Sequence, residues 1–216
     1  MSEKTLWYIA DPMCSWCWGF SPVIEGIRNE CCALVKVELL LGGLRPGTKE
    51  SMPSSQREEI LHHWHNVQRV TGQPFQFEGA MPEGFIYDTE PASRAVLAVS
   101  QIAPDLTFPF LKAVQTAFYV EQQNVTSPEV LARLAAHVGL DPHRFLQVFE
   151  SDDIKKLTLA QFHKARQWGV HGFPTIIGQS GTDYTLLTTG YCSFEELHPK
   201  LDRWLEEAAR LPDIQS

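Results

Sequence analysis

The chain has 216 residues, 44% of them hydrophobic, which is enough to bury the core of one ordinary domain. Its formal net charge is -8 and its lysines and arginines form no cluster, so nucleic acids and anionic membranes are poor partners. No apolar run approaches the roughly 18 residues that cross a membrane. The first ten residues offer only about five consecutive apolar side chains, too few for a secretory signal. We therefore expect a soluble, cytoplasmic protein.

The first predicted strand covers residues 6–10, a continuously apolar run typical of a strand buried on both faces of a sheet. A helical pattern follows and runs through Val23 and Ile27, with Pro22 expected to kink it. The apolar run at 35–41 predicts a second strand. A strand, a helix and a strand make a βαβ unit, so we expect the two strands to be parallel.

Between residues 54 and 168 the pattern predicts one helix after another and no convincing strand. Ser55 and Glu58 fit a capping box at the start of a helix that ends before Gly72. Three more helix starts, each with proline in the first turn, follow at residues 89–91, 127–129 and 141–142. This segment is predicted to form a helical insertion.

After residue 168 the composition is again that of strands. The runs at 175–177 and 184–188 predict an antiparallel hairpin. A last amphipathic helix follows, and Pro199 suggests that its regular part begins there. The predicted fold class is therefore α/β, with a central mixed sheet. Residues 1–53 and 169–211 form the sheet domain, and residues 54–168 form an inserted all-helical domain.

Five cysteines without a secretory signal argue against a framework of structural disulfides. Cys14 and Cys17 form a C-x-x-C motif where the first strand ends and the next helix begins. The unpaired N–H groups of a helix start stabilise a thiolate, so we expect Cys14 to be the nucleophile. Cys17, one turn into the helix and less exposed, can then resolve a mixed disulfide. Asp11 would oppose thiolate formation if its carboxylate lay close.

The C-x-x-C pair also fits half of a zinc site, or two cysteines that pack in a core. Zinc normally has four ligands, and no second pair stands at zinc-finger spacing, because Cys31 and Cys32 are adjacent and Cys192 is isolated. We interpret these three cysteines as small side chains without chemistry. Redox chemistry is therefore preferred for Cys14 and Cys17.

Three histidines, His62, His63 and His65, stand together, and Glu59 lies one helical turn before His63. A zinc-binding helix of the protease type carries the order H-E-x-x-H, which is missing here. An exposed helix surface or a pocket wall explains the cluster better. We expect neither a metal nor an organic cofactor.

Two stretches carry a family resemblance: Asp-Pro-Met-Cys-Ser-Trp-Cys-Trp-Gly-Phe at 11–20 and Gly-Val-His-Gly-Phe-Pro-Thr at 169–175. They resemble the signatures of the DsbA-like branch of the thioredoxin superfamily, in particular its FrnE-like cytoplasmic protein-disulfide isomerases. The resemblance spans nearly the whole chain. It implies a thioredoxin-like fold with a helical insertion, and a thiol-disulfide oxidoreductase or isomerase that acts on protein or peptide substrates.

The resemblance also implies roles for particular residues. Pro174 has a cis peptide bond in this family and faces the cysteine pair, and Phe173 presents backbone polar groups that hold an extended substrate. Independently of the resemblance, the aromatic side chains around the second thiol are expected to offer that substrate an apolar surface, or for at least one of them to pack in the core: Trp16, Trp18, Phe20 and Phe173. The Ser-Trp dipeptide at 15–16 differs from Pro-His in periplasmic DsbA and Gly-Pro in thioredoxin, so the redox potential and the direction of electron flow stay open.

Two other functions stay open at this point. The same fold resembles kappa-class glutathione transferases and 2-hydroxychromene-2-carboxylate isomerases, which typically carry serine where Cys14 stands. A glutathione-dependent transferase or isomerase is therefore the alternative enzyme, and glutathione also fits as a redox partner. The third is an interaction module whose cysteines are only structural. The oligomeric state is also open.

Overall fold

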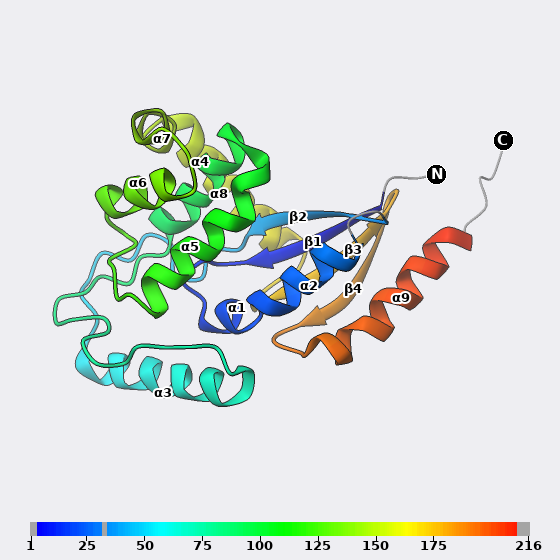
Figure 1. The fold of residues 1–216 in the computed structure, drawn as a ribbon, viewed down its shortest axis with the longest axis horizontal. Helices are drawn as coiled ribbons and strands as arrows, with labels where there is room; N and C mark the ends of the chain where they lie inside the picture. The colour runs from blue at the N-terminus through cyan, green and yellow to red at the C-terminus, as the bar shows by residue number, and fades with distance from the viewer. Residues whose placement is uncertain (1–3, 32–33, 211–216) are drawn as a thin grey trace.

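The computed structural model describes residues 4–31 and 34–210, with side chains through Glu206. The described strands form one sheet in the order β2-β1-β3-β4 (Figure 1). They are β1 (Lys4–Ala10), β2 (Lys36–Leu41), β3 (Thr175–Ser180) and β4 (Asp183–Thr189). β1 and β2 are parallel, while β3 runs antiparallel to both β1 and β4. This confirms the predicted βαβ unit, hairpin and mixed sheet.

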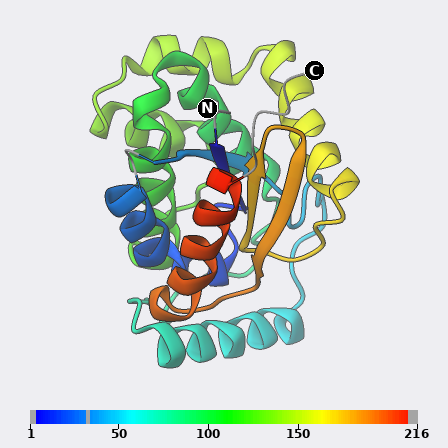
Figure 2. The same ribbon diagram turned by 90° about the vertical axis from the view of Figure 1, so that its right-hand side faces the viewer.

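Strand β1 is buried on both faces, as predicted. Leu6 and Tyr8 are fully buried in the larger core cluster, which also contains side chains of α2 (Ser21–Cys31) and α9 (Phe194–Arg210). Ile9 points the other way, into a smaller cluster with Ala165 of α8 (Asp152–Gln167). In Figure 2 the β3–β4 hairpin separates α2 and α9 from α8. The sheet is therefore the middle layer of three.

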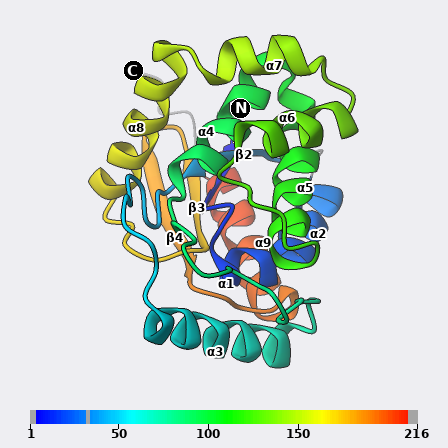
Figure 3. The ribbon, with the colours of Figure 1, turned by 90° about the vertical axis from the view of Figure 1, so that its left-hand side faces the viewer.

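Between β2 and β3 the described chain has helices joined by loops and no strand, which confirms the predicted helical insertion in a thioredoxin-like fold. Besides α8 the insertion contains α3 (Ser54–Thr71), α4 (Glu90–Ile102), the 3₁₀ turn η1 (Pro104–Leu106), α5 (Thr107–Tyr119), α6 (Pro128–His137) and α7 (Pro142–Phe149). Figure 3 shows α3 below α1 (Ser15–Gly19), apart from the other inserted helices. None of the described helices is long and apolar enough to cross a membrane. The assignment of 54–168 to a separate domain stays a prediction, since the larger core includes buried residues of both segments.

Side-chain caps explain where some of the inserted helices begin. The Ser127 hydroxyl accepts a hydrogen bond from the N–H of Val130, and the Asp141 carboxylate accepts one from His143. The predicted capping box at Ser55 is wrong, because α3 begins one residue earlier, after Pro53, and has no side-chain cap. Its first turn is largely exposed, so water can bond its free N–H groups.

Two prolines act differently from the prediction. The helix expected after the cysteines divides into α1 and α2 at Phe20, and Pro22 stands in the first turn of α2, where no N–H is needed. α9 begins at Phe194, well before Pro199. Its start is set by a reciprocal cap in which Ser193 and Glu196 each bond the backbone N–H of the other.

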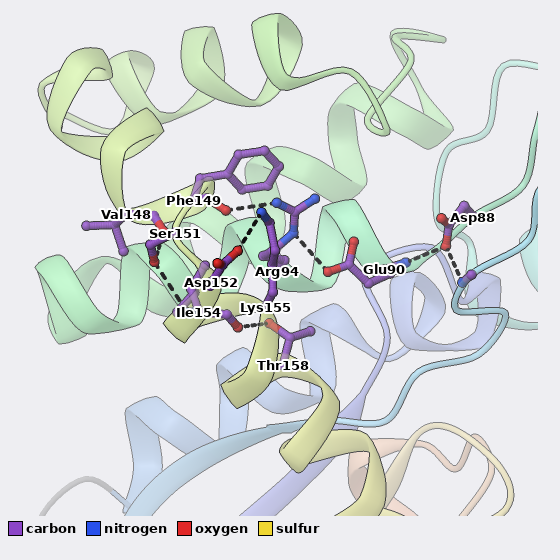
Figure 4. A network of polar contacts seen from close by, with 11 residues as sticks. Asp88, Glu90, Arg94, Val148, Phe149, Ser151, Asp152, Ile154, Lys155 and Thr158 are labelled. Carbon is purple, nitrogen blue, oxygen red and sulfur yellow. Dashed lines mark hydrogen bonds and ion pairs between the residues drawn. The ribbon is translucent and has the colours of Figure 1, made fainter.

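A polar network links the inserted helices to one another and to the loop after β2 (Figure 4). Arg94 of α4 lies 2.8 Å from the Glu90 carboxylate, donates to the Phe149 carbonyl at the end of α7, and stacks on the Phe149 ring. At the other end of the network, Asp88 accepts from the backbone N–H groups of Gly47 and Glu90. The loop after β2 is thereby joined to the start of α4.

The close approach of α9 to the sheet depends on Gly178. A Cβ atom at this position would lie 2.4 Å from the buried Trp204 ring. We expect Gly178→Ala to lower the free energy of unfolding by ~1–3 kcal/mol, because the ring or strand must shift. Chemical denaturation measures this. Gly172→Ala is the control, since its Cβ would have only one neighbour, at 4.0 Å. Equal stability of the two variants would contradict this packing.

Candidate functional site

The two cysteines of the C-x-x-C motif lie where β1 ends and α1 begins. Cys14 is the N-terminal cap residue of α1, and its carbonyl accepts hydrogen bonds from the N–H groups of Cys17 (3.0 Å) and Trp18 (3.1 Å). Cys14 is 6% exposed and Cys17 is fully buried, which confirms that the inner cysteine is the less exposed. Neither is in a disulfide, and the two side chains are in hydrogen-bonding contact.

The second signature stretch meets the first at Cys14. The Phe173–Pro174 peptide bond is cis, as the resemblance implied, and lies immediately before β3. The Cys14 sulfur is 3.6 Å from the carbonyl oxygen of Phe173, a hydrogen-bonding distance for a thiol donor. The Pro174 carbonyl accepts from the N–H of Gly190 beyond β4, which ties this turn to the hairpin.

A glycine at the end of β2 leaves room for the Phe173 ring. A Cβ atom on Gly42 would lie 2.0 Å from that ring, a distance that real Cβ contacts do not reach. The Gly42 N–H also donates to the carbonyl of Ala10, so the β2 exit is held beside the β1 exit. Three chain segments thus meet at the thiol.

Burial raises the pKa of the Cys17 thiol well above its ordinary range. The hydrogen bond to Cys14 and the charge of that residue raise it further, whereas a hydrogen bond with the Asp11 backbone lowers it. In the reduced protein Cys17 is therefore a protonated thiol held against Cys14.

Asp11 is a fully buried carboxyl group next to the motif. Its two oxygens accept hydrogen bonds from the backbone N–H groups of Met13 (2.9 Å) and Leu44 (2.7 Å). Burial raises the pKa of Asp11 to about 6, because these bonds and one from the Thr89 hydroxyl only partly offset the loss of water. Its negative charge in turn raises the pKa of Cys17. Asp11 therefore links the loop after β1 to the loop after β2, and it helps to keep the Cys17 thiol protonated.

Three buried tyrosines lie behind the C-x-x-C motif on its core side, and the sequence pattern did not identify them as site residues. The Tyr8 hydroxyl donates to the Cys17 carbonyl (3.4 Å), and the Tyr87 hydroxyl donates to the Met13 carbonyl (2.5 Å). Burial raises the pKa of Tyr8, Tyr87 and Tyr119, so all three stay protonated. Tyr8 lies in an apolar strand pattern and the other two are far along the chain, so no local signal marks them.

The aromatic residues of the motif separate into two groups. Trp18 and Phe20 are buried in the core, and the Trp18 indole donates to the Pro74 carbonyl. Trp16 and Phe173 are only half-buried, and Trp16 packs on the ring of Tyr191 at 5.7 Å between centroids. Trp18 and Phe20 are therefore core residues, whereas Trp16 and Phe173 stay partly accessible near Cys14.

The histidine cluster does not assemble a metal site. His62 and His63 are exposed, and the nearest approach of His63 to Glu59 is 4.0 Å. His65 instead stacks on Phe77 with ring centroids 3.8 Å apart. Within residues 4–31 and 34–206, no group of three or more His, Cys, Asp or Glu side chains could hold a metal ion.

The remaining cysteines lie away from the motif in the sequence. Cys31 is buried at the end of α2, and Cys192 is half-buried after β4. Cys32 lies outside the described residues.

Comparison with known proteins agrees with this geometry. Residues 6–201 match the DSBA-like thioredoxin domain family. Among solved structures, the chain is similar to a candidate protein disulfide isomerase from Nitrosomonas europaea, with 52% identity, a TM-score of 0.91 and coverage of 95% of this chain and 98% of that one. It is also similar to the cytosolic disulfide reductase DsbM from Pseudomonas aeruginosa, with 26% identity, a TM-score of 0.74 and coverage of 96% and 100%. DsbM has also been solved with GSH.

More distant relatives carry a different description. The ClpXP adapter protein SpxH of Halalkalibacterium halodurans is 24% identical over 173 residues, which span 77% of this chain and 56% of that protein. The SpxH proteins of Shouchella clausii and Bacillus subtilis are 22% and 20% identical. The chain thus spans about half the length of these relatives.

The buried carboxyl of Asp11 makes stability depend on pH. In the native state it keeps its proton up to a pKa of about 6, whereas its usual value is 3.8. As the pH rises from 4 to 7 the unfolded state loses this proton first, so the free energy of unfolding should fall by roughly 2 kcal/mol on this account. Asp11→Asn lacks this titration. Chemical denaturation at several pH values between 4 and 7 gives the free energy of unfolding of both proteins. This free energy should fall less steeply with pH in the variant, and an equal fall in both proteins would contradict the raised pKa.

Proposed function

Because the chain belongs to the DSBA-like thioredoxin domain family, we propose that it is a thiol-disulfide oxidoreductase that uses Cys14 and Cys17 on protein or peptide substrates. The observation that carries the proposal is the placement of the Cys14 sulfur. It lies at the start of α1, 3.6 Å from the Phe173 carbonyl, with Cys17 buried behind it.

In the first step the Cys14 thiolate attacks one sulfur of a substrate disulfide. A bond forms between Cys14 and that sulfur, the substrate S–S bond breaks, and the other substrate sulfur leaves as a thiolate that takes up a proton. Cys17 waits as a thiol during this step, because burial raises its pKa.

In the second step Cys17 loses its proton and attacks the sulfur of Cys14. The mixed disulfide breaks, the second substrate sulfur leaves as a thiol, and a Cys14–Cys17 disulfide forms. Two electrons have then passed from the pair to the substrate. A thiol reductant, for example glutathione, must return them before another cycle, and with the electrons running the other way the same steps oxidise a dithiol substrate.

The substrate is proposed to lie along the turn at Phe173 and Pro174. The carbonyl of Phe173 already faces the Cys14 sulfur, so a peptide bound to this turn would present its sulfur at the reactive atom. The half-buried ring of Trp16 would contact apolar side chains of that peptide.

We propose the reducing direction, in the cytoplasm. DsbM, which matches over the full length of its chain, is a cytosolic disulfide reductase and has been solved with GSH. This supports glutathione as the source of electrons for the present pair. Isomerisation of substrate disulfides would use the first step alone. Cys17 would then release a substrate that stays bound to Cys14 as a mixed disulfide.

The two cysteines should give different phenotypes when replaced. Reduction of insulin in the presence of dithiothreitol should fall to the rate of dithiothreitol alone in Cys14→Ser, because no mixed disulfide can form. When mixed with oxidised insulin in the absence of dithiothreitol, Cys17→Ser should instead accumulate a mixed disulfide between Cys14 and a substrate sulfur, since no second thiol resolves it. Non-reducing gels and mass spectrometry detect the adduct.

Cys192→Ser is the matched control for this experiment. It removes a half-buried thiol outside the motif and should keep the wild-type rate. Activity in Cys14→Ser equal to that of the wild type would rule out the proposed mechanism.

An adapter role is the second candidate, favoured by the similarity to SpxH proteins, which are described as ClpXP adapters. Such a role needs a binding surface and not a dithiol cycle. The double variant Cys14→Ser/Cys17→Ser separates the two functions: an adapter would still deliver its cargo to the protease, while the oxidoreductase would lose all exchange activity. A glutathione transferase or isomerase would show tight glutathione binding and turnover of a small molecule without oxidation of the pair.

A further inference from the structure

A cavity of about 360 Å³ lies between α2 and α5, which run side by side next to the sheet (Figure 1 and Figure 3). Its volume is within the ~300–1,000 Å³ of small-molecule pockets. The ring of Tyr8 forms part of its lining, while the Tyr8 hydroxyl donates to the carbonyl of Cys17. The cavity is thus separated from the two thiols by a buried side chain, and its lining includes neither of them.

Two cations line the cavity, Arg28 and Lys112, and among the described side chains only Lys112 is in an ion pair. The guanidinium of Arg28 stacks on the Phe108 ring, 4.1 Å from its centroid, and forms no ion pair with any carboxylate among the described side chains. Partial burial lowers the pKa of Arg28, because the charged guanidinium is less well solvated there. The negative charge of Glu25 raises the pKa of Arg28, but the Glu25 carboxylate forms its ion pair with Lys112, at 2.6 Å.

Polar groups deeper in the lining also have capacity to bind a ligand. The side-chain nitrogen of Gln115 is buried and has no hydrogen-bond partner in the described part of the chain, although the residue is only 1% exposed. An unsatisfied buried donor costs about 1–3 kcal/mol. Ser21 accepts a hydrogen bond from Gln73, so its own hydroxyl hydrogen can be donated elsewhere. These donors suit an acceptor such as a carboxylate oxygen.

The lining also includes Asn29 and the ion pair of Glu25 with Lys112, and its remaining residues are largely apolar. Ile24, Phe108, Pro109 and Leu111 contribute hydrocarbon or ring surface next to the charged and amide groups. A free inorganic anion would leave this surface in contact with water. A neutral hydrocarbon would leave the guanidinium and the Gln115 amide without partners.

We propose that this cavity is a binding site for a small monoanion with an apolar body, of the chemical class of a medium-chain alkyl carboxylate. The carboxylate bonds Arg28 and Gln115, and the body lies among the side chains of α2 and α5. The site is separate from the dithiol, so its occupation does not require either cysteine.

Octanoate is the probe for this site, and isothermal titration calorimetry on the whole chain is the measurement. Octanoate should bind saturably at one site per chain, and Arg28→Gln should weaken binding by at least about tenfold, because a hydrogen bond to a charged group is worth ~1.5–3 kcal/mol. Arg144→Gln, which removes an exposed arginine on α7, should bind as the wild type does.

Three further arms complete the test. Octan-1-ol, with the same body and no charge, and inorganic phosphate, with charge and no body, should each bind at least about tenfold more weakly than octanoate. Gln115→Leu should weaken octanoate binding while raising the melting temperature of the free protein, because it removes the unsatisfied donor. Cys14→Ser/Cys17→Ser should leave binding unchanged. Any of three results would overturn the proposal: no saturable octanoate binding to the wild type, equal affinity for octanoate in Arg28→Gln, or loss of octanoate binding in the double cysteine variant.

Discussion

The candidate site depends on the register of β1 with its two neighbours. Ile9 near the end of β1 pairs with Thr175 at the start of the antiparallel strand β3, so the chain leaving β1 meets the chain entering β3. Ala10 pairs with Leu41 at the end of the parallel strand β2, so the two exit loops also meet. The contact of Cys14 with the Phe173 carbonyl follows from this pairing and not from any local preference.

Loss of water dominates the electrostatics of this junction. The carboxyl of Asp11 accepts two backbone hydrogen bonds and still has its pKa raised to about 6, because burial outweighs them. The same effect keeps Cys17 and the tyrosines Tyr8 and Tyr87 protonated. Because Cys17 is fully buried and Cys14 is slightly exposed, the Cys14 sulfur is the reactive atom that a substrate can reach.

Most elements could be predicted from the sequence, and the errors have physical reasons. Ser127 and Asp141 were identifiable as caps because a cap bonds an N–H only two or three residues away. Ser55 matched the same pattern, but an exposed first turn needs no side-chain cap. At Pro22 the missing N–H is tolerated in a first turn, so the chain begins a new helix there where a kink was predicted.

The sequence alone determined several features that depend on neighbouring residues: the C-x-x-C pair at a strand-to-helix junction, the helix starts after Ser127 and Asp141, the two-faced burial of β1 and the helical character of 54–168. Spacing and periodicity report these because backbone geometry is local. Only the tertiary structure decided which distant groups surround the thiols. Examples are the Leu44 N–H, which donates to the Asp11 carboxylate, and the Tyr87 hydroxyl, which donates to the Met13 carbonyl. The tertiary structure also formed the cavity of Arg28 and Gln115. Such contacts are set by strand register and close packing between segments far apart in the chain, and no short-range pattern encodes them.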